Sequence, residues 1–188
     1  MTNIVACIDG SSISTAVCDA SAWASQRLDA PLKLMHVLDK AEFQVNRDLS
    51  GSLGLRGRKT VLEKLTALDE QRGKLAMEHG KHMLKEAEKR AREDGAVNIS
   101  WQQRHGNLLE TLREFEVQTL LGVIGRRGKG SESLVGAIGS HLESVIRTVR
   151  GPILVAVKGF VAPTNFMIAY DASATAEKAL DWVAASQL

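Results

Sequence analysis

Short apolar runs alternate with longer amphipathic segments along most of the chain. The runs with the length and apolar content of β-strands are residues 3–8, 32–38, 97–104, 120–124 and 152–157. Strands separated by helical segments are typical of a parallel sheet whose strands are joined by helical crossovers. The pattern therefore predicts an α/β fold built on a parallel sheet.

Helical periodicity fills the intervals between these runs. The first helix is predicted over residues 12–28, with Ser11 or Ser12 as its N-cap. A short helix is predicted after Asn107, because Asn107 and Glu110 have the spacing of an N-terminal capping pattern.

A long charged helix is predicted over residues 60–94. Thr60, followed by Glu63 three positions later, can cap its start, and Gly95 can end it. Residues 40–59 are polar and carry several glycines, so we expect an excursion without a strand there.

The end of the chain repeats its beginning. Residues 165–173 have the pattern of residues 3–11, an apolar strand followed by Asp and Ser, at a constant offset of 162. We therefore expect a complete domain over residues 1–158 and the start of a second repeat over residues 159–188, with one strand at 166–170 and one helix. Because so short a segment cannot bury a core alone, the second domain would be truncated.

A glycine-rich segment is the main candidate for binding chemistry. Residues 125–140 contain five glycines in sixteen positions, follow an apolar run and lead into a helix that begins at Ser140. Glycines let backbone N–H groups approach a phosphate, and a helix N-terminus favours an anion. Arg126, Arg127 and Lys129 add positive charge beside the loop. The structural alternative is a tight surface turn.

Composition narrows the functional classes. The 188 residues fit one domain, and 44% hydrophobic with 24% charged residues is typical of a soluble globular protein. A net charge of +2 without a basic aromatic stretch argues against a nucleic-acid partner. No apolar run is long enough to span a membrane and no signal peptide precedes the first strand, so the cytoplasm is the expected location. Cys7 and Cys18 are expected to be buried thiols.

Catalytic and metal-binding patterns are weak. The loop is not a G-x-x-x-x-G-K-S/T phosphate cradle, and Glu132 is its one acidic residue, which offers no obvious Mg²⁺ cage. His79 and His82 have a spacing that could hold a metal, although a solvated charged helix face is the favoured interpretation. The sequence therefore supports ligand binding better than catalysis.

Residues 1–158 resemble a universal stress protein domain of the UspA type. The resemblance rests on four elements in order, which are Ile8 to Ser11, His36-Val37, Val123 to Gly128, and Gly139-Ser140 with the closing Gly151 to Val157. It implies an open five-stranded parallel sheet in the order 3-2-1-4-5, flanked by helices, of the adenine-nucleotide alpha-hydrolase-like type. The repeat makes the chain look like a tandem-type member with a truncated second domain.

ATP-binding members of this family carry the motif G-x2-G-x9-G-S/T. Gly125 and Gly128 match its start, whereas ten residues rather than nine precede Gly139 and Ser140. A loop absorbs one extra residue easily, so we interpret the motif as retained. The resemblance then implies ATP, with or without Mg²⁺, as the ligand.

The resemblance also implies a set of nucleotide-binding residues at the switch point between the first and fourth strands. They are Asp9, Val37, Gly125, Arg127, Gly128, Gly139, Ser140 and His141. The loop backbone and the Ser140 hydroxyl would hold the phosphates, and Arg127 would screen their charge. The main chain of Val37 would meet the adenine, and Asp9 would lie near the base or ribose. Asp9 as a turn cap and Val37 as a core residue are the structural alternatives.

An ATP-binding regulatory protein of the stress response is the leading functional hypothesis. A slow ATPase or phosphotransfer enzyme and a dimerisation module that binds no nucleotide are the alternatives. The fifth strand is apolar and lies at a sheet edge in the implied order, where a bare strand invites pairing. A homodimer through this strand is therefore expected.

Overall fold

The computed structural model describes residues 2–39, 55–128 and 140–188, without the side chains of residues 55–63, 140 and 141. Its centre is a parallel sheet in the order β3-β2-β1-β4-β5. The strands are β1 (Asn3–Cys7), β2 (Leu32–Leu38), β3 (Ile99–His105), β4 (Thr119–Gly125) and β5 (Ile153–Ala156). The predicted α/β fold and its strand order are confirmed.

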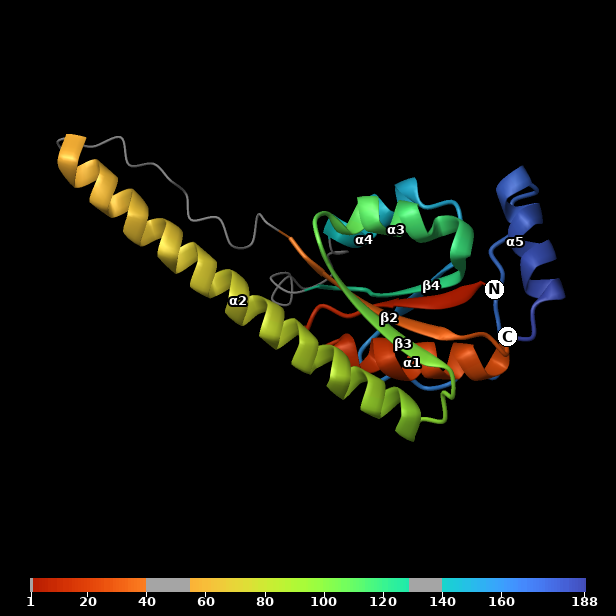
Figure 1. Cartoon of the computed structure of the whole chain (residues 1–188). Coiled ribbons are helices and arrows are strands. Elements are labelled where there is room, and N and C mark those ends of the chain that lie inside the picture. Colours follow the sequence, from red (N-terminus) through yellow and green to blue (C-terminus); the bar gives the residue numbers. More distant parts are fainter. Residues whose placement is uncertain (1, 40–54, 129–139) are drawn as a thin grey trace.

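Helices cover both faces of this sheet. The described helices are α1 (Ser14–Arg27), α2 (Leu55–Glu93), α3 (Leu108–Phe115), α4 (Ser140–Thr148) and α5 (Ala174–Ala185), with a short 3₁₀ helix at Glu116–Gln118. Helices α1 and α2 lie on one face, α3 and α4 on the other, and the first half of α2 extends well beyond the sheet (Figure 1). Among the residues that the structure describes, no helix is long and apolar enough to cross a membrane.

The central strands are buried on both faces because their side chains alternate between two cores. Ile4 and Ala6 of β1 face the core under α1 and α2, whereas Val5 faces the core under α3 and α4. All three side chains are fully buried. Such strands read as continuous apolar runs, which is why the sequence pattern located them.

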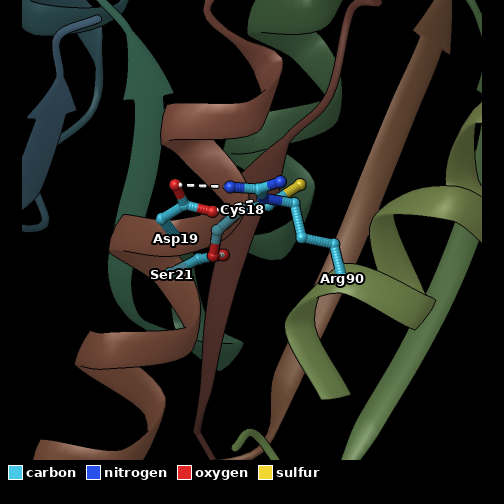
Figure 2. A network of polar contacts seen from close by, with 4 residues as sticks. All are labelled: Cys18, Asp19, Ser21 and Arg90. Carbon is cyan, nitrogen blue, oxygen red and sulfur yellow. Dashed lines mark hydrogen bonds and ion pairs between the residues drawn. The ribbon is translucent and has the colours of Figure 1, made fainter. Parts of the chain in front are cut away.

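A bidentate ion pair ties α1 to α2. Arg90 of α2 donates from Nε to Asp19 Oδ1 at 2.5 Å and from Nη2 to Asp19 Oδ2 at 3.0 Å. Figure 2 shows the guanidinium meeting the carboxylate beside the buried Cys18 of α1. The pair fixes the part of α2 that packs on the sheet, and partial exposure limits its contribution to stability to about 1 kcal/mol.

Helix α2 begins earlier than predicted. It runs without interruption from Leu55, so residues 55–59 belong to it and Thr60 does not cap it. Leu, Arg and Lys are strong helix formers, and they outweigh the single Gly57 in this first turn. Residues 40–54 of the predicted excursion lie outside the described residues. The predicted stop is confirmed, since Gly95 follows the helix with φ +92°.

The predicted N-cap of α3 is confirmed, whereas that of α1 is wrong. Asn107 caps α3 as expected, its Oδ1 accepting a hydrogen bond from the N–H of Leu109 at 2.8 Å. Neither Ser11 nor Ser12 caps α1, because Ile13 occupies that position without a side-chain cap. The carboxylate of Asp9 organises this turn instead.

The C-terminal segment keeps the turn of the predicted repeat without its strand. Residues 166–170 pair with no strand, which contradicts the expected strand, whereas helix α5 forms as expected. Asp171 Oδ1 accepts from the N–H of Ser173 at 3.0 Å, as Asp9 Oδ1 accepts from the N–H of Ser11 at 3.0 Å. Ala172 has φ +59°, and Gly10, at the equivalent position, has φ +74°. The two turns therefore share a geometry as well as a sequence pattern.

Candidate functional site

The turn after β1 is organised around the carboxylate of Asp9. Its Oδ1 accepts from the N–H of Ser11 at 3.0 Å and from Ser14 Oγ at 2.9 Å. Ser14 Oγ in turn accepts from the N–H of Gly10 at 3.0 Å. These bonds place Asp9 at the start of α1, where it caps the turn as in the structural alternative, and its contact with a nucleotide stays a prediction.

The end of β4 passes close to this turn. A Cβ added to Gly128 would lie 3.0 Å from Asp9 Oδ2. A Cβ on Gly125 would lie 3.1 Å from the carbonyl oxygen of Arg127 and 3.2 Å from Ile13 Cγ2. Real Cβ atoms rarely tolerate such contacts, so both glycines permit an approach that a larger residue would hinder.

Asp9, Gly125 and Gly128 thus meet at the carboxyl ends of β1 and β4. These two strands are neighbours in the sheet, while the chain leads from them to opposite sides of the strand order. Open α/β sheets bind ligands at this switch point. The structure brings together the predicted site residues from the first turn and from the start of the glycine-rich segment.

Val37 lies on β2, beside the strand that carries Asp9. Its side chain is half-buried and packs against the core under α3 and α4. Its side chain thus has the core role of the structural alternative, and the contact of its main chain with adenine stays a prediction. The preceding residue, His36, is linked to β1, since its Nδ1 lies 2.7 Å from the carbonyl oxygen of Ile8.

The remaining predicted residues fall partly or wholly outside the described structure. Gly139 and the loop between Gly128 and Ser140 lie outside it, as do the side chains of Ser140 and His141. The backbone of Ser140 begins α4, as predicted. The contact of its hydroxyl with a phosphate stays a prediction.

An open cleft of about 430 Å³ adjoins the switch point. It is lined by Ser12, Ile13, Arg126, Arg127, Val157 and Lys158. Arg126 and Arg127 were predicted from the sequence, whereas Lys158 and the role of Ser14 were not. A lysine directly after the last apolar run, and a serine five positions after Asp9, were the available signals.

Cys7, at the end of β1, is a thiol close to Asp9. Burial, with a smaller contribution from the nearby Asp9 carboxylate, raises the pKa of the Cys7 thiol to about 12. Such a thiol is not a nucleophile at neutral pH. Within the described ranges, no group of three or more His, Cys, Asp and Glu side chains could hold a metal ion. His79 and His82 are both exposed on α2, which matches a solvated helix face.

The sequence matches a known family over most of its length. The family model of the Universal stress protein family matches residues 1–158. The chain is 31% identical over 192 residues to Universal stress protein Slr1230 of Synechocystis sp. (strain ATCC 27184 / PCC 6803 / Kazusa), covering 100% of this chain and 66% of that protein. The chain thus spans about two thirds of the length of this relative.

Solved structures have the same fold. Hypothetical protein MJ0577 superimposes with a TM-score of 0.63 at 19% identity, covering 84% of this chain and 96% of that one. A universal stress protein solved in complex with cAMP superimposes with a TM-score of 0.54 at 19% identity, covering 84% of this chain and 98% of that one. These structures share the fold, and the family-model match over residues 1–158 shows that the chain belongs to the universal stress protein family.

Proposed function

We propose that this protein binds an adenine nucleotide, ATP, in the crevice between the ends of β1 and β4, as a regulatory protein of the stress response. The observation that carries the proposal is the approach of the Gly128 backbone to Asp9, with 3.0 Å between Oδ2 and the position of a Cβ. This packing leaves glycine backbone and a carboxylate side by side at the switch point of the sheet. The cAMP complex of a structural neighbour supports an adenine nucleotide as the class of ligand.

The proposed roles follow the geometry of the crevice. Backbone N–H groups at Gly125 and Gly128, with those of Gly139 and Ser140 across the loop, would hold the phosphates. The Ser140 hydroxyl would donate to a phosphate oxygen beside His141, and Arg127 would offset the phosphate charge. Asp9 would accept a hydrogen bond from the base or ribose, next to the main chain of Val37.

Calorimetric titration with ATP, with and without Mg²⁺, tests this proposal. We expect micromolar binding by the native protein and at least about a tenfold loss in Gly128→Val, because the branched side chain would collide with Asp9. Gly151→Ala is the matched control, since a Cβ there meets nothing within 4 Å. Equal affinity in Gly128→Val, or no binding by the native protein, would contradict the site.

The same samples separate binding from hydrolysis. A regulatory protein releases no phosphate over the time of the titration. Mg²⁺-dependent phosphate release that Gly128→Val abolishes would instead identify the slow ATPase that the sequence left as an alternative. The measurement is inorganic phosphate against time at saturating ATP.

We also propose that the protein forms a homodimer through β5. This strand lies at the edge of the sheet, and Val157, directly after it, is 47% exposed. An apolar edge strand favours pairing with a second chain. Light scattering at micromolar concentration should give the mass of a dimer, and Val157→Lys should shift it towards a monomer. A monomeric mass for the native protein would contradict the proposal.

A cytoplasmic location stays a prediction.

A further inference from the structure

The cleft beside the switch point gathers positive charge from two neighbouring strands. Arg126 and Arg127 follow β4, and Lys158 lies two residues beyond the end of β5. The strands pair up to their ends, with Gly125 opposite Ala156, and the N–H of Arg126 donates to the carbonyl oxygen of Ala156 at 2.9 Å. The backbone therefore holds the three basic residues at one level of the sheet, around one cleft.

The described salt bridges do not include these three basic side chains, and the carboxylate of Asp9, at the start of α1, is held by the N–H of Ser11 and by Ser14 Oγ. The residues that line the cleft include no carboxylate. The described salt bridges involve other basic residues, four of them arginines at positions 90, 92, 104 and 147. Bringing like charges together costs free energy unless a counter-charge joins them, so this arrangement favours an anionic ligand.

The start of α1 forms one wall of the cleft. Ser12 and Ile13 line the cleft from this helix end, and the first turn of α1 carries no acidic residue. Asp9 Oδ1 accepts from the N–H of Ser11 at this helix end, so its carboxylate offsets the partial positive charge of the N-terminus. The three basic side chains therefore define the site.

The cleft also continues the crevice in which we place the nucleotide. Arg127 precedes Gly128, whose backbone approaches Asp9, and Ile13 contacts the position of a Cβ on Gly125. A ligand whose base and ribose lie near Asp9 can therefore extend its phosphates into the cleft. The volume of about 430 Å³ falls within the range of about 300–1,000 Å³ typical of small-molecule sites.

We infer that this cleft holds the polyphosphate tail of the nucleotide, and that Lys158, with Arg126, makes the site select ligands by their number of phosphates. The inference rests on the proposed function and names a property that it does not include. A nucleoside triphosphate reaches the cations of both strands, whereas a monophosphate leaves Lys158 without an anionic partner. Affinity should therefore rise from AMP to ADP to ATP.

Titrations with AMP, ADP and ATP in the presence of EDTA test the inference on the full chain. We expect ATP to bind at least about tenfold more tightly than AMP, because charge-assisted contacts to phosphate are strong. Lys158→Gln should lower the ratio of ATP to AMP affinity about three- to fivefold, the size of one partly exposed charge contact, with little change for AMP. Lys178→Gln, which removes an equal charge from α5 beside the opposite end of β1, should change neither affinity (Figure 1).

The outcomes distinguish the two proposals. Binding of all three nucleotides with equal affinity, or an unchanged ratio in Lys158→Gln, would overturn the role of the cleft and leave the nucleotide site intact. The absence of binding by any adenine nucleotide would overturn both. A ratio that falls equally in Lys178→Gln would reduce the effect to net charge and would also overturn the role of Lys158.

Discussion

At the scale of single residues, burial determines the chemistry of the two cysteines. Cys18 of α1 is buried in the core under α1 and α2, whereas Cys7 of β1 is half-buried and packs against the opposite core. Burial raises the pKa of each thiol from its ordinary value of 9.0 to about 12, and Asp9 and Asp19 add smaller contributions of the same sign. Both side chains are therefore structural.

We predict that neither thiol reacts with iodoacetamide in the native protein at pH 8, because only about one thiol in ten thousand is then ionised. Unfolding of the chain should make both thiols reactive. The raised pKa values also determine how the free energy of unfolding changes with pH. As the pH rises through about 9, the unfolded chain loses these protons first, so the free energy of unfolding should fall. Labelling followed by mass spectrometry, with a denatured control, is the measurement. Fast labelling of the folded chain would contradict the burial.

The site residues differed in how far the sequence could predict them. Asp9, Gly125 and Gly128 belong to local patterns at strand ends, and the strand order brings such ends together. The contribution of Lys158 depends on the pairing of β4 with β5, which no local pattern contains. The N-cap position of Ile13 in α1 could not be predicted either, because the side chain of Asp9 bonds to the turn that Ser11 or Ser12 was expected to cap.

At the scale of elements, two glycines of α2 have opposite environments. A Cβ on Gly80 would collide with the side-chain amide of Gln103 and lie 2.7 Å from Cδ2 of His36. A Cβ on Gly73 would meet nothing within 4 Å. Gly80 therefore allows the helix to approach β2 and β3, whereas Gly73 lies in the part of the helix that extends beyond the sheet.

We predict opposite effects of alanine at these positions. Gly73→Ala should stabilise the protein by about 0.5–1 kcal/mol, because alanine loses less backbone entropy in a helix. Gly80→Ala should destabilise it by about 1–2 kcal/mol, because the His36 ring and Gln103 must shift. Urea unfolding of the two variants gives both values. A stabilising Gly80→Ala would show that α2 does not pack this closely.

The elements themselves were largely predictable, and the exceptions have physical causes. Buried parallel strands are continuous apolar runs, so all five were located from the sequence. The start of α2 was misplaced because residues 55–59 combine strong helix formers with a glycine. Residues 166–170 have the composition of a strand, but a strand also needs neighbours, and the described structure offers them none.

At the scale of the whole molecule, the C-terminal segment packs against the α/β sheet domain. Phe160 lies 5.9 Å from Trp23, between ring centroids, and Trp182 and Leu188 pack against the core under α1 and α2. The shared turn geometry of Asp9 and Asp171 supports our proposal that residues 159–188 begin a second repeat. The exposed apolar side chains at 166–168 are consistent with a strand that lacks its sheet.

We predict that a chain ending after residue 162, which keeps Phe160, still unfolds cooperatively. Its stability should fall by about 1–3 kcal/mol, the amount expected from losing the partial burial of Trp182 and Leu188. Its affinity for ATP should change by less than about twofold, because α5 is distant from the crevice. Calorimetry measures both quantities. Loss of the cooperative transition would contradict a complete domain over residues 1–158.

The most direct test of the proposed nucleotide site is to map ATP-induced changes in the amide NMR spectrum of the protein. We expect the largest chemical-shift changes to cluster at the ends of β1, β2 and β4, around Asp9, Val37, Gly125 and Gly128, and to continue to Lys158. Changes centred on another part of the molecule, or a spectrum that millimolar ATP leaves unchanged, would contradict it.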